Sequence, residues 1–597
     1  MNLNHLKYKK IKTDILIIGS GGAGLRAAIE VAKNDVQVLV VTKGIFGKCG
    51  ATVTAGMFMD APSSRIKEIC GIPGVREDTE ESFCKDMFEE GKYINSEELV
   101  WTHCSNAAKY IKELVDWGIK IDGLNQSPGH RYPRSLISNG RSLMQTLIKQ
   151  FKKYNIKYLE NTMITNLLTA NKQIVGAVGI ELISGDFLVI NAKAVILATG
   201  GAMRIYPIVT APQELVGDGM FMAFEVGAKL TDMEFPLFLP ACLYWPESMK
   251  GLNLPYTISS EVGGWWLNAF GERFIKKWDP QRMEAGTTRD VASIAQAVEI
   301  IEGRCSPHGG IYVSFKHLPN ELLSAYIEKD PILKNFKYGG FSLLNFDMDP
   351  REVAYEAGPA AHYWNGGIKI NKKCETNIIG LYAAGEVQGG TMGANRLAGN
   401  AITECIVFGA LSGKNASQFI KKKNFSFSKI DNNQLKKYYE KLYQPLLLKE
   451  GIAVNHIRKK LQEMAFKYIG PIRTGSELQK CLEEIKRIRK DIPYVATICK
   501  ERTYNREWIE ALELNPMISL LEIVARSSLM REESRGAMYR KDFPNTDNKD
   551  WLSNIIVYKN KDKLDFMKSP IMTSFIQTPK PERIPYMIPK WEFSRRH

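Results

Sequence analysis

Residues 14–24 read DILIIGSGGAG, an apolar run that leads directly into closely spaced glycines. The apolar run predicts a buried β-strand, and the sequence GLRAAIEVAKN that follows, at 24–34, has the apolar spacing of a helix. A second apolar run, VQVLVVTKG, occupies 36–44. The three segments predict a β-α-β unit of about 30 residues, the size typical of a dinucleotide-binding fold.

The glycines between this strand and helix follow the pattern G-x-G-x-x-G. In such a turn Gly19 allows the sharp bend, Gly21 lets a pyrophosphate approach the positive end of the helix, and Gly24 lets the helix pack closely on the sheet. Gly22 and Ala23 complete the turn. An ordinary tight turn remains the alternative for a single pattern of this kind.

The end of the second predicted strand lacks the acidic residue that would bind the ribose of NAD, because Thr42 and Lys43 stand there. Two later glycine segments, AVILATGG at 194–201 and GLYAAGEV at 380–387, resemble the second and third FAD signatures of large flavoproteins. That resemblance implies FAD as the cofactor, with Thr199 and Gly200 in the second segment and Gly385 and Glu386 in the third beside it.

Composition excludes several other classes of protein. No window approaches the 18 or so consecutive apolar residues of a membrane span, and no secretory signal is recognisable at the start. The ten cysteines show no C-x-x-C spacing, so we expect no metal or iron–sulfur site in this chain. The net charge of +15 suits an acidic partner or a solvated basic surface, whereas motifs typical of nucleic-acid binding are absent.

Longer motifs resemble the flavoprotein subunits of succinate dehydrogenase and fumarate reductase, and their relative L-aspartate oxidase. The resemblance runs from about 12 to 552 and rests on five segments: GDGMFMAFEVGAKLTDMEF (217–235), TTRDVASIAQAVEIIEGR (287–304), GPAAHYWNGGIKIN (358–371), GANRLAGNAITECIVFG (393–409) and ARSSLMREESRGAMYRKDFPNTDNKDW (525–551).

The resemblance implies an α/β Rossmann-like FAD-binding domain at 1–235 and 350–425, interrupted by an α+β capping domain at 236–349. A C-terminal helical domain is expected at 426–545. The basic, proline-punctuated segment 546–597 is expected to be an extended tail, either without regular structure or laid along a partner.

Three catalytic residues carry over from the family motifs. Arg289 matches the proton-donating arginine, and His362 and Arg396 match groups that hold a substrate carboxylate. A surface ion pair with Asp290 and a core histidine are the plainer alternatives for the first two. The remaining residues that the resemblance places beside FAD are Thr42, Lys43, Ala51, Thr52, Gly56, Asp218, Arg396, Asn400, Ala401 and Ile402.

Several positions depart from the family pattern. Ala51 replaces the histidine that attaches flavin covalently, so FAD is expected to bind non-covalently. Leu239 replaces a substrate-carboxylate histidine, and YTISSEVGG at 256–264 lacks the substrate threonine and the glutamate and arginine of the proton relay. His362 is followed by Tyr-Trp-Asn, and Trp265 and Trp266 add aromatic surface.

These features predict an FAD-dependent oxidoreductase that transfers hydride between flavin N5 and a C=C or CH–CH bond of an organic acid or its thioester. We expect a flavoprotein subunit with iron–sulfur partners, located in the cytoplasm or, through those partners, at the inner face of a membrane. The alternatives are an electron-relay subunit with a vestigial pocket and an L-aspartate oxidase-like enzyme. An open cavity at the catalytic residues would favour an enzyme, whereas Trp265, Trp266 or Trp364 filling it would favour a relay.

Overall fold

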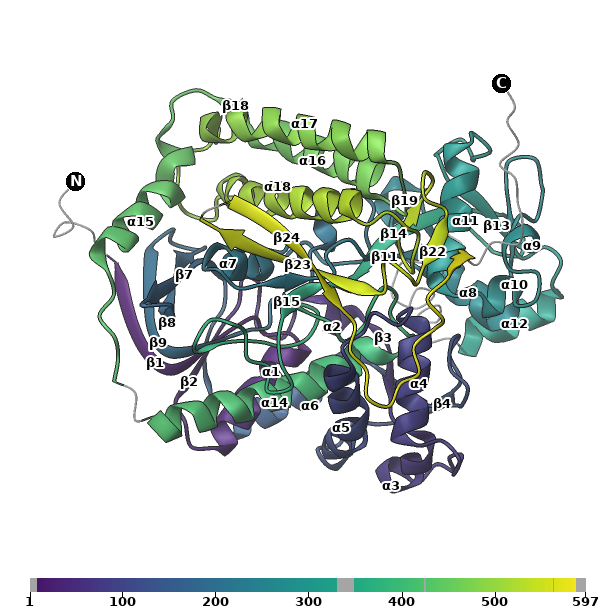
Figure 1. Ribbon diagram of the computed structural model, residues 1–597, viewed down its shortest axis with the longest axis horizontal. Coiled ribbons are helices and arrows are strands. Elements are labelled where there is room, and N and C mark those ends of the chain that lie inside the picture. The colour runs from purple at the N-terminus through teal and green to yellow at the C-terminus, as the bar shows by residue number, and fades with distance from the viewer. Residues whose placement is uncertain (1–7, 330–347, 424–425, 562, 587–597) are drawn as a thin grey trace.

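The computed structural model describes residues 8–329, 348–423, 426–561 and 563–586 (Figure 1). Its largest sheet has seven strands, in the order β6-β2-β1-β9-β8-β7, with β16 also paired to β9. β1 (Lys9–Ile18) lies between β2 (Val38–Val41) and β9 (Phe187–Leu197) and is parallel to both. The β-α-β unit is therefore confirmed. The other strands are β6 (Lys157–Leu159), β7 (Thr162–Ala170), β8 (Gln173–Glu181) and β16 (Leu381–Ala383).

Helices cover this sheet, and two of them cross closely. α1 (Gly22–Lys33) packs against α14 (Asn400–Lys423), which links segments from distant parts of the chain. A Cβ at Gly409 or Gly413 would lie 2.7 or 2.4 Å from backbone oxygens of α1. Small residues at these positions thus let the two helices approach. Further helices of this part are α4 (Glu80–Glu90), α5 (Glu97–Asp116), α6 (Gly140–Lys153) and α7 (Asp218–Glu225).

The capping region is built on an antiparallel sheet of order β11-β14-β13-β12. This sheet includes a strand that lies after 349, because β14 (Tyr355–Trp364), which carries the catalytic candidate His362, pairs with β11 (Pro236–Leu243). A separate apolar core forms under this sheet and includes Trp266. The other elements are α8 (Leu254–Val262), β12 (Trp265–Leu267), α9 (Ile275–Trp278), α10 (Met283–Gly286), α11 (Arg289–Ile301), β13 (Ile311–Ser314) and α12 (Asn320–Lys329).

The helical region contains four long helices, of which α16, α17 and α18 stack along one side of the molecule while α15 lies apart at the left in Figure 1. α18 packs against both α16 and α17. The four helices are α15 (Asn432–Leu447), α16 (Val454–Ile469), α17 (Gly475–Asp491) and α18 (Arg506–Met530).

The segment after 545 differs from the expected tail. β23 (Ser553–Asn560) and β24 (Lys563–Pro570) form a hairpin, drawn in yellow in Figure 1, and β23 pairs with β10 (Leu230–Thr231). The reason is apolar content: Ile555, Ile556 and Val557 are buried within a five-stranded sheet. Residues 587–597 of the expected tail lie outside the described residues.

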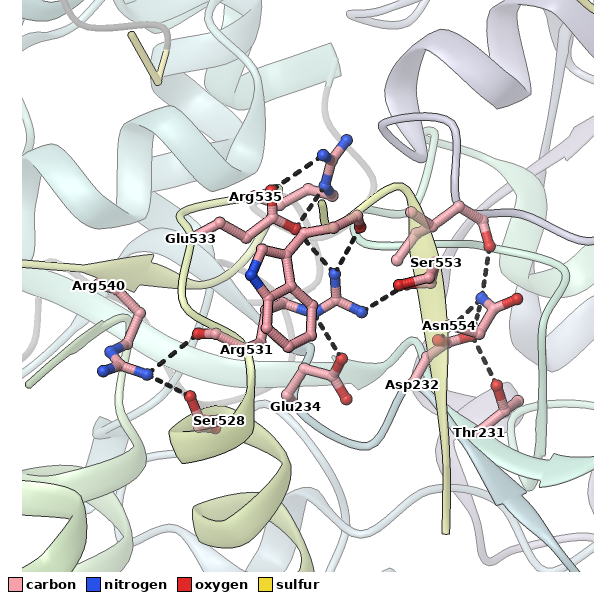
Figure 2. Close-up of polar contacts among 12 residues, drawn as sticks. Thr231, Asp232, Glu234, Ser528, Arg531, Glu533, Arg535, Arg540, Ser553 and Asn554 are labelled. Carbon is pink, nitrogen blue, oxygen red and sulfur yellow. Dashed lines mark hydrogen bonds and ion pairs between the residues drawn. The ribbon is translucent and has the colours of Figure 1, made fainter. Parts of the chain in front are cut away.

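A buried ion network joins the end of α18 to the loop before β11 (Figure 2). Arg531 Nε lies 2.8 Å from Glu234 Oε1, and Arg531 Nη1 lies 2.7 Å from Glu533 Oε1. Arg535 Nε contacts the same Glu533 oxygen at 2.8 Å. The network fixes the chain just ahead of β11, which forms part of the cavity wall described below. Among the described residues, no helix is both long and apolar enough to cross a bilayer.

Candidate functional site

One cavity of about 660 Å³ extends from the glycine turn to the capping region. The catalytic candidates Arg289 and His362 line it. Sixteen of the residues predicted to contact the cofactor also line it: Gly19, Gly21, Gly22, Ala23, Thr42, Lys43, Ala51, Thr52, Gly56, Thr199, Gly200, Asp218, Glu386, Arg396, Ala401 and Ile402. Gly24, Gly385 and Asn400 stand behind the wall. Concave sites of this size, with a few convergent polar groups, are typical of cofactor and substrate binding.

The glycine turn presents the start of α1 to the cavity. The backbone N–H of Gly22 donates to Thr52 Oγ1 at 3.1 Å. A Cβ on Gly24 would lie 2.0 Å from the Gly19 carbonyl oxygen, whereas a Cβ on Gly21 would meet only Thr52 Oγ1, at 3.8 Å. Gly24 thus serves packing, and the open space beside Gly21 fits a pyrophosphate at the helix N-terminus.

Lys43 is neutralised within the protein. Its Nζ lies 2.8 Å from Asp218 Oδ2 and 2.5 Å from Glu513 Oε1, and Glu513 also pairs with Arg458 at 2.5 Å. Burial alone would lower the pKa of Lys43, but the two carboxylates raise it above its usual range. Lys43 therefore connects α7 and α18 across the end of β2.

Several buried polar atoms near the glycine turn have no hydrogen-bond partner within the described part of the protein, as expected where FAD would bind. Thr199 Oγ1, Glu214 Oε2 and Asp218 Oδ1 have no hydrogen-bond partner. Glu386 Oε1 accepts from the backbone N–H of Trp364 at 3.0 Å, and burial raises the pKa of Glu386 to about 7. Asn400 lies behind the wall, where its Oδ1 is 2.8 Å from His103 Nε2.

The catalytic candidates meet at the other end of the cavity. Arg289 is the first residue of α11, His362 lies on β14, and Arg396 precedes α14. Arg289 Nε and Nη1 and Arg396 Nε are buried without hydrogen-bond partners. The Arg396 guanidinium lies over the Tyr363 ring, 4.7 Å from its centroid. Arg289 and His362 both line the cavity, which is the placement expected of residues that contact a bound molecule.

The electrostatics of this end favour an anion. Burial, with Arg289 and Arg396 nearby, lowers the pKa of His362 well below 6.5, so its imidazole is neutral. Burial and the charge of Arg289 lower the pKa of Arg396 to about 10, which leaves the guanidinium charged at neutral pH. Among the described residues, neither arginine has a carboxylate within ion-pair distance, so two cations face one cavity.

Another part of the cavity lining is less polar. Leu239 is buried and lines the cavity, together with Tyr256, Thr257 and Ser260 of α8. The Thr257 hydroxyl donates to the Asn253 carbonyl at 3.1 Å, and the Ser260 hydroxyl donates to the Thr257 carbonyl at 2.9 Å. Both hydroxyl protons are thus committed to the backbone of α8.

The three tryptophans do not line this cavity. Trp265 stacks on His317 with ring centroids 4.2 Å apart, while Trp266 is in the capping core and Trp364 is fully buried in the main core. Sequence reasoning missed Thr210, a lining residue on the loop before α7 that carries no motif.

Comparison with known proteins agrees with the fold and with FAD as the cofactor. The FAD binding domain family matches residues 14–402, and the Fumarate reductase flavoprotein C-term family matches 458–585. An uncharacterized FAD-dependent oxidoreductase of Methanocaldococcus jannaschii is 37% identical, over 93% of this chain and 98% of its own length. A subunit of the fumarate reductase (CoM/CoB) of Methanothermobacter marburgensis is 33% identical, over 91% of this chain and 96% of its own.

A solved structure of Mycobacterium smegmatis Sdh1 in complex with UQ1 superposes with a TM-score of 0.84 at 28% identity, covering 95% of this chain and 96% of that one. The matching domains, the cavity and the shared length lead to one assignment. The chain belongs to the fumarate reductase and succinate dehydrogenase flavoprotein family, and it is an FAD-binding oxidoreductase.

Proposed function

We propose that this flavoprotein transfers hydride between FAD and a C=C or CH–CH bond of an organic acid or its thioester. One observation carries the proposal: Arg289 and Arg396 present unpartnered guanidinium nitrogens to a single cavity. Leaving a buried charge unpaired costs on the order of several kcal/mol. The site is therefore complementary to a carboxylate or to a strongly polarised carbonyl oxygen.

The residues have separate tasks. When bound, FAD supplies the hydride chemistry. The planar guanidinium of Arg396 binds the substrate oxygen atoms, held in place by its stacking on Tyr363. Arg289, whose Nε and Nη1 are buried, gives a proton to the carbon next to the one that receives the hydride. Neutral His362 lies between Arg396 and Thr210, and its contacts with both hold the Arg396 guanidinium in position.

The less polar part of the lining supports a substrate with only one polar end. Leu239 offers no hydrogen bond, and the hydroxyls of Thr257 and Ser260 already donate within α8. A second carboxylate placed there would lose its hydration without gaining charged partners. We therefore favour a monocarboxylate or a thioester over fumarate or succinate.

An electron-relay role without substrate is less well supported, because none of the three tryptophans lines the cavity. A partner remains part of the proposal. The Methanothermobacter relative is, by its name, one component of a larger fumarate reductase. A net charge of +15 suits docking on an acidic partner, and we propose an iron–sulfur protein in that position.

A substrate screen tests the proposal. FAD-loaded protein is mixed with reduced viologen and with a matched series of unsaturated monocarboxylates, dicarboxylates and thioesters, and viologen oxidation is followed. We expect turnover with a monocarboxylate or thioester, and a loss of at least about 100-fold in Arg289→Lys and Arg396→Lys. Arg351→Lys, which alters a capping-region arginine paired with Asp349, is the control and should retain activity.

Each contrary outcome has a separate meaning. Fumarate reduced faster than every monocarboxylate and thioester would contradict the substrate class. Full flavin occupancy without turnover of any compound in the series would favour the relay role instead.

A further inference from the structure

A second polar cluster lies behind the catalytic arginines. Glu90 ends α4, Lys92 follows two residues later, and Asp290 is in the first turn of α11. Lys92 Nζ lies 3.7 Å from Glu90 Oε2 and 3.6 Å from Asp290 Oδ2. The side chains of Glu90 and Lys92 are 10% and 12% exposed, and that of Asp290 is 0% exposed. The cluster thus extends from the solvent edge into the interior.

The chain connects this cluster directly to both arginines. Asp290 follows Arg289 in α11, and its Oδ1 accepts from Thr288 Oγ1 at 2.5 Å. Asn395 precedes Arg396 and donates from Nδ2 to Glu90 Oε1 at 2.6 Å. The chain neighbours of both catalytic arginines therefore belong to the cluster or contact it.

Glu90 is the member of the cluster whose pKa lies near neutrality. Burial raises the pKa of Glu90 to about 7; Asp290 adds to the rise, while Lys92, Arg282 and Arg289 oppose it. Burial alone would lower the pKa of Lys92, but Asp290 and Glu90 raise it, so the amine is charged.

A tyrosine closes the cluster from the C-terminal segment. Burial, with the charges of Asp290 and Glu90, raises the pKa of Tyr586 well above 10. Its hydroxyl donates to the Gly536 carbonyl at 2.5 Å. The Tyr586 hydroxyl is therefore neutral and borders the cluster without adding a charge. The pKa of about 7 belongs to Glu90.

We propose that Glu90, Lys92 and Asp290 form a buried proton reservoir that recharges Arg289 after each turnover. The inference rests on the proposed function, in which Arg289 gives a proton to the substrate. The neutral guanidine then regains a proton from the cluster: Lys92 passes one toward Arg289 by way of Asp290, Glu90 restores Lys92, and water restores Glu90. Only N–H and O–H bonds form and break, and no electron moves.

Geometry favours this route over one through α8. The cavity-lining residues of α8 are Tyr256, Thr257 and Ser260, and none of these carries a carboxylate or an amine. The Lys92 contacts of 3.6 and 3.7 Å are ion-pair contacts, which a small rotation of the flexible lysine converts to hydrogen bonds. No carboxylate lies within ion-pair distance of Arg289 among the described residues, so a bridging water completes the last step.

The decisive variant is Glu90→Gln, which keeps the shape and the Asn395 contact but cannot release a proton. We expect kcat for reduction to fall roughly 10- to 100-fold with KM unchanged. In the wild type, the rate falls as pH rises through about 7, because Glu90 then loses its proton. The variant should lose this inflection, whereas a purely structural role would leave it in place.

Asp232→Asn is the matched control. Burial and Glu234 raise the pKa of Asp232 to about 7 as well, but Asp232 contacts Thr231 and Asn554 and does not line the cavity. Its kcat and pH profile should match the wild type. If Glu90→Gln fails to bind flavin, Lys92→Met carries the same test. An unchanged kcat and inflection in a folded variant would overturn the reservoir.

A second measurement does not depend on a substrate. Infrared difference spectra of FAD-loaded protein between pH 6 and 8 report carboxyl groups that ionise in this range. We expect part of the protonated-carboxyl band of the wild type to be missing in Glu90→Gln. Identical bands would show that Glu90 does not titrate there, and would overturn the reservoir whether or not any compound is turned over. Absence of turnover with every compound would instead count against the proposed function alone.

Discussion

Thr210 Oγ1 lies 2.7 Å from Nδ1 of His362, and this contact holds the imidazole ring from one side. On the other side of the ring, Nε2 lies 3.5 Å from Nη2 of Arg396. A guanidinium only donates hydrogen bonds, so Nε2 accepts and Nδ1 donates to Thr210. The neutral imidazole is thus fixed in one tautomer and one orientation, with the lone pair of Nε2 directed at Arg396.

Removing the Thr210 hydroxyl should therefore loosen His362 without changing the cofactor end of the cavity. We expect Thr210→Val to lower kcat/KM by about 10-fold, consistent with the loss of one hydrogen bond of about 1.4 kcal/mol. Thr210→Ser keeps the hydroxyl and should retain activity. Steady-state kinetics with the substrate found in the screen, beside flavin content, make the comparison; equal losses in both variants would contradict this role of the hydroxyl.

Two glycines of the same turn should respond differently to alanine. A Cβ on Gly24 would lie 2.0 Å from the Gly19 carbonyl oxygen, so Gly24→Ala should destabilise the apoprotein. A Cβ on Gly21 would have only Thr52 Oγ1 nearby, at 3.8 Å, so Gly21→Ala should fold normally and lose FAD affinity. Thermal unfolding of the apoproteins and flavin titration separate the two effects. A stable Gly24→Ala apoprotein would refute the packing role.

The flavin should be released by acid precipitation, because Ala51 cannot form a histidyl–flavin bond. Ala51 lines the cavity at the start of α2 (Ala51–Thr54). We expect all flavin in the supernatant after precipitation, and an unshifted mass for the denatured chain. A chain heavier by one FAD would show attachment through another residue.

Stability of the apoprotein should fall between pH 6 and pH 8. Burial raises the pKa of both Glu386 and Glu404 to about 7, above the value of an unfolded chain. Their stabilising effect is complete below the unfolded pKa and is lost as pH rises through the folded value, and about 1 kcal/mol of that loss for each group falls in this interval. Urea unfolding at the two pH values measures the loss, and Glu404→Gln should make it smaller. A stability that rises over this interval would contradict the assignment.

The buried network of Figure 2 should be sensitive to the loss of its central cation. Arg531→Met leaves Glu234 and Glu533 without that partner, and we expect a loss of about 3–5 kcal/mol in the free energy of unfolding. Arg506→Met removes an exposed pair with Glu510 and should change stability by less than about 0.5 kcal/mol. Similar values for the two variants would show that burial does not strengthen the network.

Sequence motifs predicted those parts of the molecule whose structure depends on residues close together in the chain. The glycine turn, the β-α-β unit and the convergence of Arg289, His362 and Arg396 could be expected, since each lies in a motif with its own spacing or family likeness. Thr210 could not, because only the folding of its loop brings a common hydroxyl residue to the histidine. The partnership of Lys43 with Glu513 likewise depends on packing between distant segments.

The segment after 545 shows how such expectations fail. Its lysines and prolines suggested a chain without regular structure, yet three buried residues, Ile555, Ile556 and Val557, place it in a sheet with β10. A short apolar run within a basic segment is a weak predictor of a strand, because strand formation depends on whether a neighbouring strand is available for pairing and packing.

The pairing of β10 with β23 has a consequence for synthesis of the protein. β10 leaves the ribosome well before its partner strand, because most of the capping region and all four long helices are synthesised between them. Until then, the edge of β10 that faces β23 has open backbone groups, which are a template for pairing with other chains. Synthesis of β23 therefore allows this edge to close, and a nascent or truncated product without β23 leaves it open to chaperones and to aggregation.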